Sequence, residues 1–227
     1  MDFAEVVEFL EAHADPEYAK SMARYNIPTD NLLGISGPVV KELVGKVGRD
    51  HELALQLWEG PYRECRGLAC RIAEPAKVTE ELMEEWVARF DSWGICDVAC
   101  GYLFIYTPFA WKKAIEWAGR EEEFVRRSGF SMMASLAAAD KEAEDKEFLR
   151  FLPLIKEYSG DERNFVKKAV NWALRQVGKR NPALNNAAIE TAEEIIEIGT
   201  KSGRWIARDA LRELRSEKVQ KRLNISE

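Results

Sequence analysis

Apolar residues recur at intervals of three and four along the whole chain, which is the spacing of one buried face of an α-helix. No segment alternates apolar and polar residues between turn signals, so we predict no β-strands. The chain is therefore expected to be all-α. The periodic segments predict helices over roughly Phe3–His13, Glu17–Tyr25, Pro38–Gly48, Asp50–Trp58, Tyr62–Glu74, Thr79–Phe90, Ser92–Ile105, Pro108–Gly119, Glu122–Ala139, Lys141–Tyr158, Arg163–Gly178, Pro182–Thr200 and Gly203–Leu214.

Residues that start and stop helices agree with this pattern. Thr79 precedes EELMEEW and Asp161 precedes ERNFVKKAVNWALRQV, and the side chains of both can accept hydrogen bonds from first-turn amides. Glycine tolerates the left-handed conformation that ends many helices. It marks expected helix ends at Gly48, Gly60, Gly119, Gly160 and Gly178.

The helices form short pairs that recur about every 40 residues, without the signatures of tetratricopeptide or ankyrin units. This favours a HEAT-like solenoid of stacked antiparallel pairs, curved, with a concave binding face. We expect residues 1–227 to form one such domain. A compact globin-like or bundle arrangement is the alternative.

Composition is that of a folded globular chain, with 46% hydrophobic and 32% charged residues. The N-terminal segment MDFAEVVEFLEAHADPEYAK is amphipathic and acidic, and it has neither a basic start nor an uninterrupted apolar run. We interpret it as neither a signal peptide nor a membrane anchor. We expect a soluble cytoplasmic protein, a monomer with no membrane partner.

Four cysteines are spaced C-x4-C and C-x3-C, and the chain has only two histidines. Structural zinc sites usually pair cysteines at closer spacing, so we expect no metal site and no cofactor. The cysteines lie in apolar helical sequence such as LACRIA, which favours buried small side chains.

The formal net charge of −6 argues mildly against nucleic acid, but its distribution along the chain matters more. Acidic residues crowd the first half, and basic residues accumulate from Arg163 onward. A basic face on an acidic protein is therefore possible. Candidate contacts to a DNA backbone are Lys167, Lys168, Arg175, Lys179, Arg208 and Arg212.

Several kinds of catalytic site are excluded. The chain contains no glycine-rich phosphate loop, HExxH pair, G-x-S-x-G elbow or cysteine–histidine dyad. Hydrolysis by a nucleophilic triad or by a metal is not expected.

The segment DSWGICDVACGYLF is the most informative, because Trp93 and Asp97 are four residues apart and share one helix face. A carboxylate in such an apolar helix costs free energy unless it is paired or open to a cleft. Asp97 is therefore a candidate functional acid. A structural ion pair or a position at the helix start is the alternative.

Two further segments combine apolar faces with cations. In EEEFVRRSGF, Arg126 and Arg127 lie near a helix start, where cations oppose the helix dipole; pairing with Glu121–Glu123 would account for them. In NFVKKAVNWALRQVGKRNP, Trp172 lies among basic residues. Core packing explains most such tryptophans and a solvated face explains most such cations, but together they also suit phosphate contact.

The chain resembles the AlkD-type DNA alkylation repair proteins, HEAT-like solenoids that excise cationic methylated purines. The similarity extends from MARYNIPTDNLLGI through EEWVARFDSWGICD and FVRRSGF to NFVKKAVNWALRQVGKRNP and WIARDALREL, in the same order. Two positions differ: Gly94 stands where the family commonly has an acid, and Ser135 where its glycosylases have a basic residue.

The resemblance implies specific roles. In the family, matching residues line the lesion site, so Asp97 would stabilise the developing oxocarbenium ion. Trp93 and Trp172 would hold the deoxyribose, and Arg127 would bind a phosphate. If the alignment with the family shifts by one residue, Arg126 takes the place of Arg127. Tyr25 matches the family's N-terminal tyrosine.

These roles predict a glycosylase acting on double-stranded DNA that contains 3-methyladenine or 7-methylguanine. A cationic purine leaves without a general acid, so one carboxylate is enough, whereas ordinary glycosides require two. The alternative is a non-catalytic scaffold that binds a protein or a DNA structure through its concave face.

Overall fold

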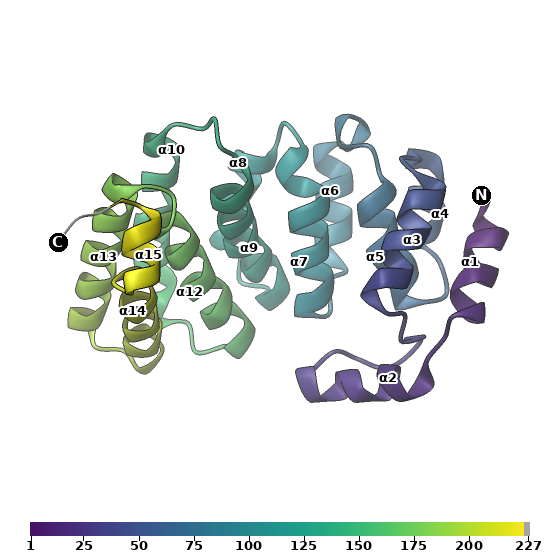
Figure 1. Cartoon of the computed structure of the whole chain (residues 1–227), viewed down its shortest axis with the longest axis horizontal. Helices are drawn as coiled ribbons and strands as arrows, with labels where there is room; N and C mark the ends of the chain where they lie inside the picture. Colours follow the sequence, from purple (N-terminus) through teal and green to yellow (C-terminus); the bar gives the residue numbers. More distant parts are fainter. Residues whose placement is uncertain (225–227) are drawn as a thin grey trace. The chain divides into compact units, whose positions relative to one another are not determined.

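The computed structural model describes residues 1–224, and all regular secondary structure within them is helical (Figure 1). The all-α prediction is confirmed. The chain divides into two compact units, Met1–Pro108 and Phe109–Glu227. The prediction that residues 1–227 make a single domain stays a prediction.

The first unit consists of short helices, and a longer loop over residues 26–36 precedes α3 (Figure 1). Helices α4 and α5 pack together, as do α5 and α7. The indole rings of Trp58 and Trp86 stack in the core with centroids 4.1 Å apart. The helices are α1 (Phe3–Ala12), α2 (Pro16–Ser21), α3 (Gly37–Val47), α4 (His51–Trp58), α5 (Arg63–Ile72), α6 (Glu80–Ala88) and α7 (Trp93–Tyr102), with 3-10 turns at Met22–Tyr25, Pro75–Lys77 and Phe104–Tyr106.

Side-chain caps explain where several of these helices begin. Asp15, Asp50 and Thr79 each precede a helix and accept a hydrogen bond from the amide three residues later. These bonds satisfy first-turn amides that have no partner within the helix. The cap predicted at Thr79 is thus confirmed, with α6 starting at the next residue.

The second unit has longer helices, and α9 and α12 pack along each other. Helix α9 also packs on α8, and α14 packs on both α12 and α13 (Figure 1). The helices are α8 (Ala110–Ala118), α9 (Glu123–Ala139), α10 (Asp145–Leu149), α11 (Phe151–Glu157), α12 (Asn164–Gly178), α13 (Pro182–Ile198), α14 (Lys201–Leu214) and α15 (Glu217–Arg222), with a 3-10 turn at Tyr158–Gly160.

Helix α9 is buried on every side along most of its length. Its closest approach is at Gly129, where a Cβ atom would lie 2.3 Å from the amide nitrogen of Ala118 at the end of α8. A side chain cannot fit at that distance, so glycine is what lets α8 and α9 pack so closely. Helix α9 is thus held by α8 on one side while it packs against α12.

Two predicted helical features differ from the structure. The helix expected over Lys141–Tyr158 is two short helices, α10 and α11, because Pro153 has no amide to donate to Leu149, the last residue of α10. Asp161 does not cap α12, which begins after Arg163 without a side-chain cap. Helix α15 lies beyond the last helix expected from the sequence and begins at a Ser216 cap.

None of the helices within residues 1–224 is long and apolar enough to cross a membrane. In the same range, no group of three histidine, cysteine or acidic side chains is placed to hold a metal ion.

Candidate functional site

Helix α7 carries the tryptophan and the aspartate that the sequence singled out. It begins at Trp93 itself, and its buried positions include Cys96, Ala99 and Cys100. Trp93 and Asp97 lie one turn apart on another face, and both are partly exposed. The buried positions fix α7 against α5, so the partly exposed face is held in a defined direction.

Trp93 is fixed by the main chain of a distant segment. Its indole Nε1–H donates to the carbonyl oxygen of Tyr25 over 2.7 Å. Asn26 ends the 3-10 turn there in the left-handed conformation, with φ of 56°. The Tyr25 ring itself is exposed, and the Arg24 guanidinium lies 4.7 Å from its centre. The structure thus connects Tyr25 and Trp93 through the backbone carbonyl of Tyr25.

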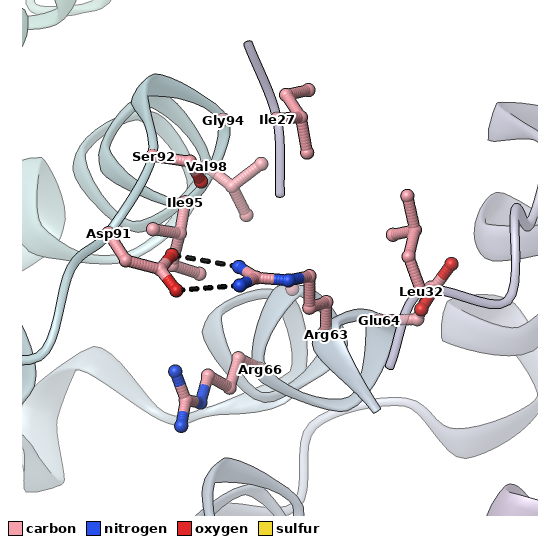
Figure 2. Close-up of a pocket in the computed structure, with 11 residues that line it drawn as sticks. Ile27, Leu32, Arg63, Glu64, Arg66, Asp91, Ser92, Gly94, Ile95 and Val98 are labelled. Atoms are coloured by element: carbon pink, nitrogen blue, oxygen red, sulfur yellow. Dashed lines mark hydrogen bonds and ion pairs between the residues drawn. The ribbon is translucent and has the colours of Figure 1, made fainter. Parts of the chain in front are cut away.

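A mostly apolar pocket of about 200 Å³ lies between Ile27 and a face of α7 other than the one that carries Trp93 and Asp97 (Figure 2). Gly94, Ile95 and Val98 form one wall, and Ile27 faces them. A Cβ atom at Gly94 would lie 3.6 Å from Ile27, an ordinary contact distance. The glycine is therefore accommodated without being sterically required.

An ion pair and a set of carboxylate–amide hydrogen bonds form the polar side of this pocket. Arg63 and Asp91 form a double hydrogen-bonded pair with both distances 2.8 Å (Figure 2). The Glu64 carboxylate accepts main-chain amides of residues 33–35 at 2.8 to 3.3 Å. The bonds to Glu64 hold the loop before α3 in place. Arg63, Asp91 and Glu64 together carry one negative charge, which the Arg66 side chain in the same lining balances.

In the second unit, Arg127 is a buried side chain with only 5% of its surface exposed. Its Nη1 donates to the carbonyl oxygen of Phe165 in the first turn of α12 over 2.7 Å. Trp172 lies two turns further along α12 and is partly exposed. Arg127 thus connects α9 to the helix that carries Trp172.

Its neighbour Arg126 is paired with Asp161, at 3.0 Å, and not with the Glu121–Glu123 segment considered from the sequence. The Arg126 guanidinium also lies 4.5 Å from the ring centre of Tyr158. Asp161 binds Arg163 as well. Burial by itself would raise the pKa of Asp161, but hydrogen bonds from Arg163 and Arg126 hold it below its ordinary value.

The six candidate DNA-backbone residues fall into two groups. Glu213 binds both Arg175, at 2.5 Å, and Lys179, at 2.7 Å, while Arg212 pairs with Asp209. The other three make no ion pair with any residue in 1–224. Lys168 and Arg208 are exposed, and the ammonium group of Lys167 lies 5.1 Å from the centre of the Trp205 ring.

The two units differ in charge, as the sequence indicated. Of the 33 lysines and arginines, 10 lie in Met1–Pro108 against 19 acidic residues, and 23 lie in Phe109–Glu227 against 20 acidic residues. The predicted accumulation of cations toward the C-terminus is thus a property of one whole unit.

The four cysteines are buried thiols. Burial raises the pKa of the Cys65 thiol, and it raises that of Cys70 to about 12. Neither is a thiolate at neutral pH, and the thiolate is the form that acts as nucleophile and metal ligand. They serve as small apolar side chains, as predicted.

A comparison with family models decides the relationship. Residues 6–214 match the family described as DNA alkylation repair enzyme. The chain belongs to the DNA alkylation repair enzyme family. The resemblance proposed from the sequence is thereby confirmed.

Two relatives extend the assignment. The chain is 24% identical over 221 residues to the uncharacterized protein Lin0241 of Listeria innocua serovar 6a, covering 95% of this chain and 96% of that protein. A solved structure, described as a new family of proteins related to the HEAT-like repeat DNA glycosylases with affinity for branched DNA structures, matches with a TM-score of 0.77. Its identity is 22%, and the match covers 86% of this chain and 83% of the other. The HEAT-like fold of this alkylation repair family member follows.

Proposed function

We propose that this protein is a DNA glycosylase that releases cationic alkylated purines by hydrolysing their N-glycosidic bond. The supporting observation is the arrangement on α7, where the Trp93 indole is held by the Tyr25 carbonyl and the Asp97 carboxylate lies one turn later. A pinned aromatic face beside a carboxylate suits a reacting group that becomes positively charged.

The proposed mechanism requires a single carboxylate. A purine methylated at N3 or N7 carries a positive charge and departs as a neutral base, so no proton needs to be supplied to it. The sugar left behind develops oxocarbenium character, and the negative charge of Asp97 stabilises it. Water then adds to the anomeric carbon and loses a proton.

Other residues have supporting roles in this proposal. In the first unit, Trp93 contacts the deoxyribose of the lesion; in the second unit, Trp172 contacts the DNA sugar and Arg127 a backbone phosphate. Because Arg127 donates to the Phe165 carbonyl, we expect it to share or exchange that bond when DNA is bound. Lys168 and Arg208 are exposed cations suited to further phosphate contact.

The test is release of 3-methyladenine and 7-methylguanine from methylated duplex DNA, measured at low salt for the wild type and Asp97→Asn. Removing one electrostatic contribution to a transition state typically lowers the rate constant by about 100- to 1,000-fold. We expect a loss of that order, with DNA affinity largely retained.

Asp30→Asn is the matched control, because it makes the same chemical change at an exposed carboxylate in the same unit. It should release both bases at the wild-type rate. If the folded wild type released neither base above the spontaneous rate, or if Asp97→Asn matched Asp30→Asn, Asp97 catalysis would be ruled out.

A second candidate is binding of a branched DNA structure without base release. The specific observations in its favour are the burial of Arg127 and the affinity for branched DNA stated for the structural relative. Tight binding of a branched junction by a wild type that releases no base would support this function instead.

A further inference from the structure

A groove lies in the first unit, one turn further along α5 and α7 than the pocket beside Gly94. It has a volume of about 760 Å³ and is lined by α3, by the loop that follows it, and by α5 and the last residue of α7. That volume lies in the range of ligand-binding clefts. Its polar lining comes from four side chains: Lys41, Arg49, Arg71 and Tyr102.

All the charged residues lining the groove are cations. Within residues 1–224, none of the three forms an ion pair. This contrasts with their neighbours, since Lys46 on the same helix pairs with Glu42 at 2.8 Å. Three of the ten cations of an otherwise acidic unit therefore line one groove without a carboxylate to neutralise them.

The two arginines are held in place by the protein's own main chain. Arg49 Nη1 donates to the carbonyl oxygens of Arg71 and Ala73, at 3.0 and 2.5 Å. Arg71 Nη1 donates to the carbonyl oxygen of Gly67 over 2.7 Å. These bonds use one nitrogen of each guanidinium and position the remaining donors, so an anion entering the groove meets preorganised charge.

Tyr102 adds an aromatic surface to this charge. The residue is 52% exposed although its aromatic ring is large, and the Arg71 guanidinium lies 4.4 Å from the ring centre. An exposed ring beside cations is the combination that binds single-stranded nucleic acid, with bases stacked on the ring and phosphates on the cations. Bases inside a duplex are already stacked and cannot use such a ring.

We propose that this groove binds an unpaired DNA strand, with a base stacked on Tyr102 and the adjacent phosphates bound by Lys41, Arg49 and Arg71. The assignment rests on the proposed role of the chain in DNA binding, and it adds a site that does not take part in base release. Sequence reasoning missed the groove because its residues are separated by up to about 60 positions and no motif connects them.

The experiment measures binding of a fluorescein-labelled oligothymidylate by fluorescence anisotropy across a series of salt concentrations. Tyr102→Ala should weaken binding about tenfold through lost stacking, while Tyr102→Phe should bind like the wild type. Lys41→Gln should lower the slope of log K against log salt by about 0.7, the value for one phosphate contact on a single strand. Lys41 and Tyr102 are exposed, so all three variants should keep wild-type thermal unfolding.

Lys46→Gln is the matched control, since it removes the same charge from α3 outside the groove. Equal salt slopes for Lys41→Gln and Lys46→Gln, or unchanged affinity in Tyr102→Ala, would overturn the proposal. Displacement of the oligothymidylate by an oligoglutamate peptide at equal charge concentration would do the same, by indicating an acidic protein partner.

Failure of this proposal is separable from failure of the glycosylase function. If the wild type releases no methylated base but binds the oligothymidylate through Tyr102 and Lys41, the groove proposal stands and the glycosylase proposal fails. If the wild type releases methylated bases but substitutions of Tyr102 and Lys41 leave oligothymidylate binding unchanged, the glycosylase proposal stands and the groove proposal fails.

Discussion

Replacing Asp161 with asparagine removes a carboxylate that joins two helices of the second unit. Its oxygens bind Arg126 of α9 at 3.0 Å and the Arg163 side chain at the start of α12. The carboxylate is 7% exposed and Arg126 is 14% exposed, so the variant leaves a nearly buried guanidinium without its counter-charge.

The cost can be worked from these contacts. Breaking a buried ion pair typically destabilises by about 3 to 5 kcal/mol. Arg163 is a third exposed and can turn to water, and Arg126 keeps its contact with the Tyr158 ring, so we expect a smaller cost than this range, about 2 to 3 kcal/mol. For a chain of this length that corresponds to a fall in Tm of about 4 to 12 °C.

The pH dependence provides the sharper test. Because the pKa of Asp161 is lower in the folded protein than its ordinary 3.8, the ionised carboxylate stabilises the folded state above that value. The contribution is lost as pH falls from about 3.8 through the lower folded pKa. The difference in free energy of unfolding between wild type and Asp161→Asn should be full at pH 7 and should shrink below about pH 3.8.

Urea unfolding followed by tryptophan fluorescence and circular dichroism at several pH values measures this difference. Glu122→Gln is the comparison: hydrogen bonds from Arg120 place the pKa of Glu122 at about 2, yet both side chains are exposed and water screens the pair. We expect little change in its stability at pH 7. A difference for Asp161→Asn that stayed constant down to low pH, or equal effects of the two variants, would refute the reasoning.

Two further predictions concern packing. Trp93→Phe removes the indole N–H that donates to the Tyr25 carbonyl, and it should lower the free energy of unfolding in urea by about 1 kcal/mol. It should also slow the release of methylated bases. An unchanged release rate would show that the fixed orientation of the Trp93 ring is unimportant. Gly129→Ala puts a Cβ atom within 2.3 Å of the Ala118 amide nitrogen and should lower the free energy of unfolding by about 3 kcal/mol, whereas Gly45→Ala, with open space around it, should not.

The sequence predicted those parts of the fold that depend on local pattern. Periodicity and a cap residue located α6 at Thr79, and the four-residue spacing of Trp93 and Asp97 put both on α7. Pro153 was a local signal too, and the break between α10 and α11 could have been predicted from its missing amide.

Contacts between distant segments lay outside the reach of such patterns. The bond between Trp93 and the Tyr25 carbonyl spans 68 residues and uses a main-chain atom, which no side-chain motif records. Asp161 looked like a helix cap because the residues beside it begin a helix, but its partner Arg126 lies 35 residues away. Charge alone could not separate Lys168, which is exposed, from Lys179, which Glu213 neutralises.

The all-round burial of α9 has a consequence for motion. A helix whose amides are covered on every side exchanges them with solvent only through large opening events, so α9 should be among the slowest regions in hydrogen–deuterium exchange. The α10–α11 break, with its short helices, should exchange earlier. Arg127 therefore sits on a helix whose backbone we expect to stay in place when DNA binds. Any phosphate contact it makes has to come from rotation of the side chain alone.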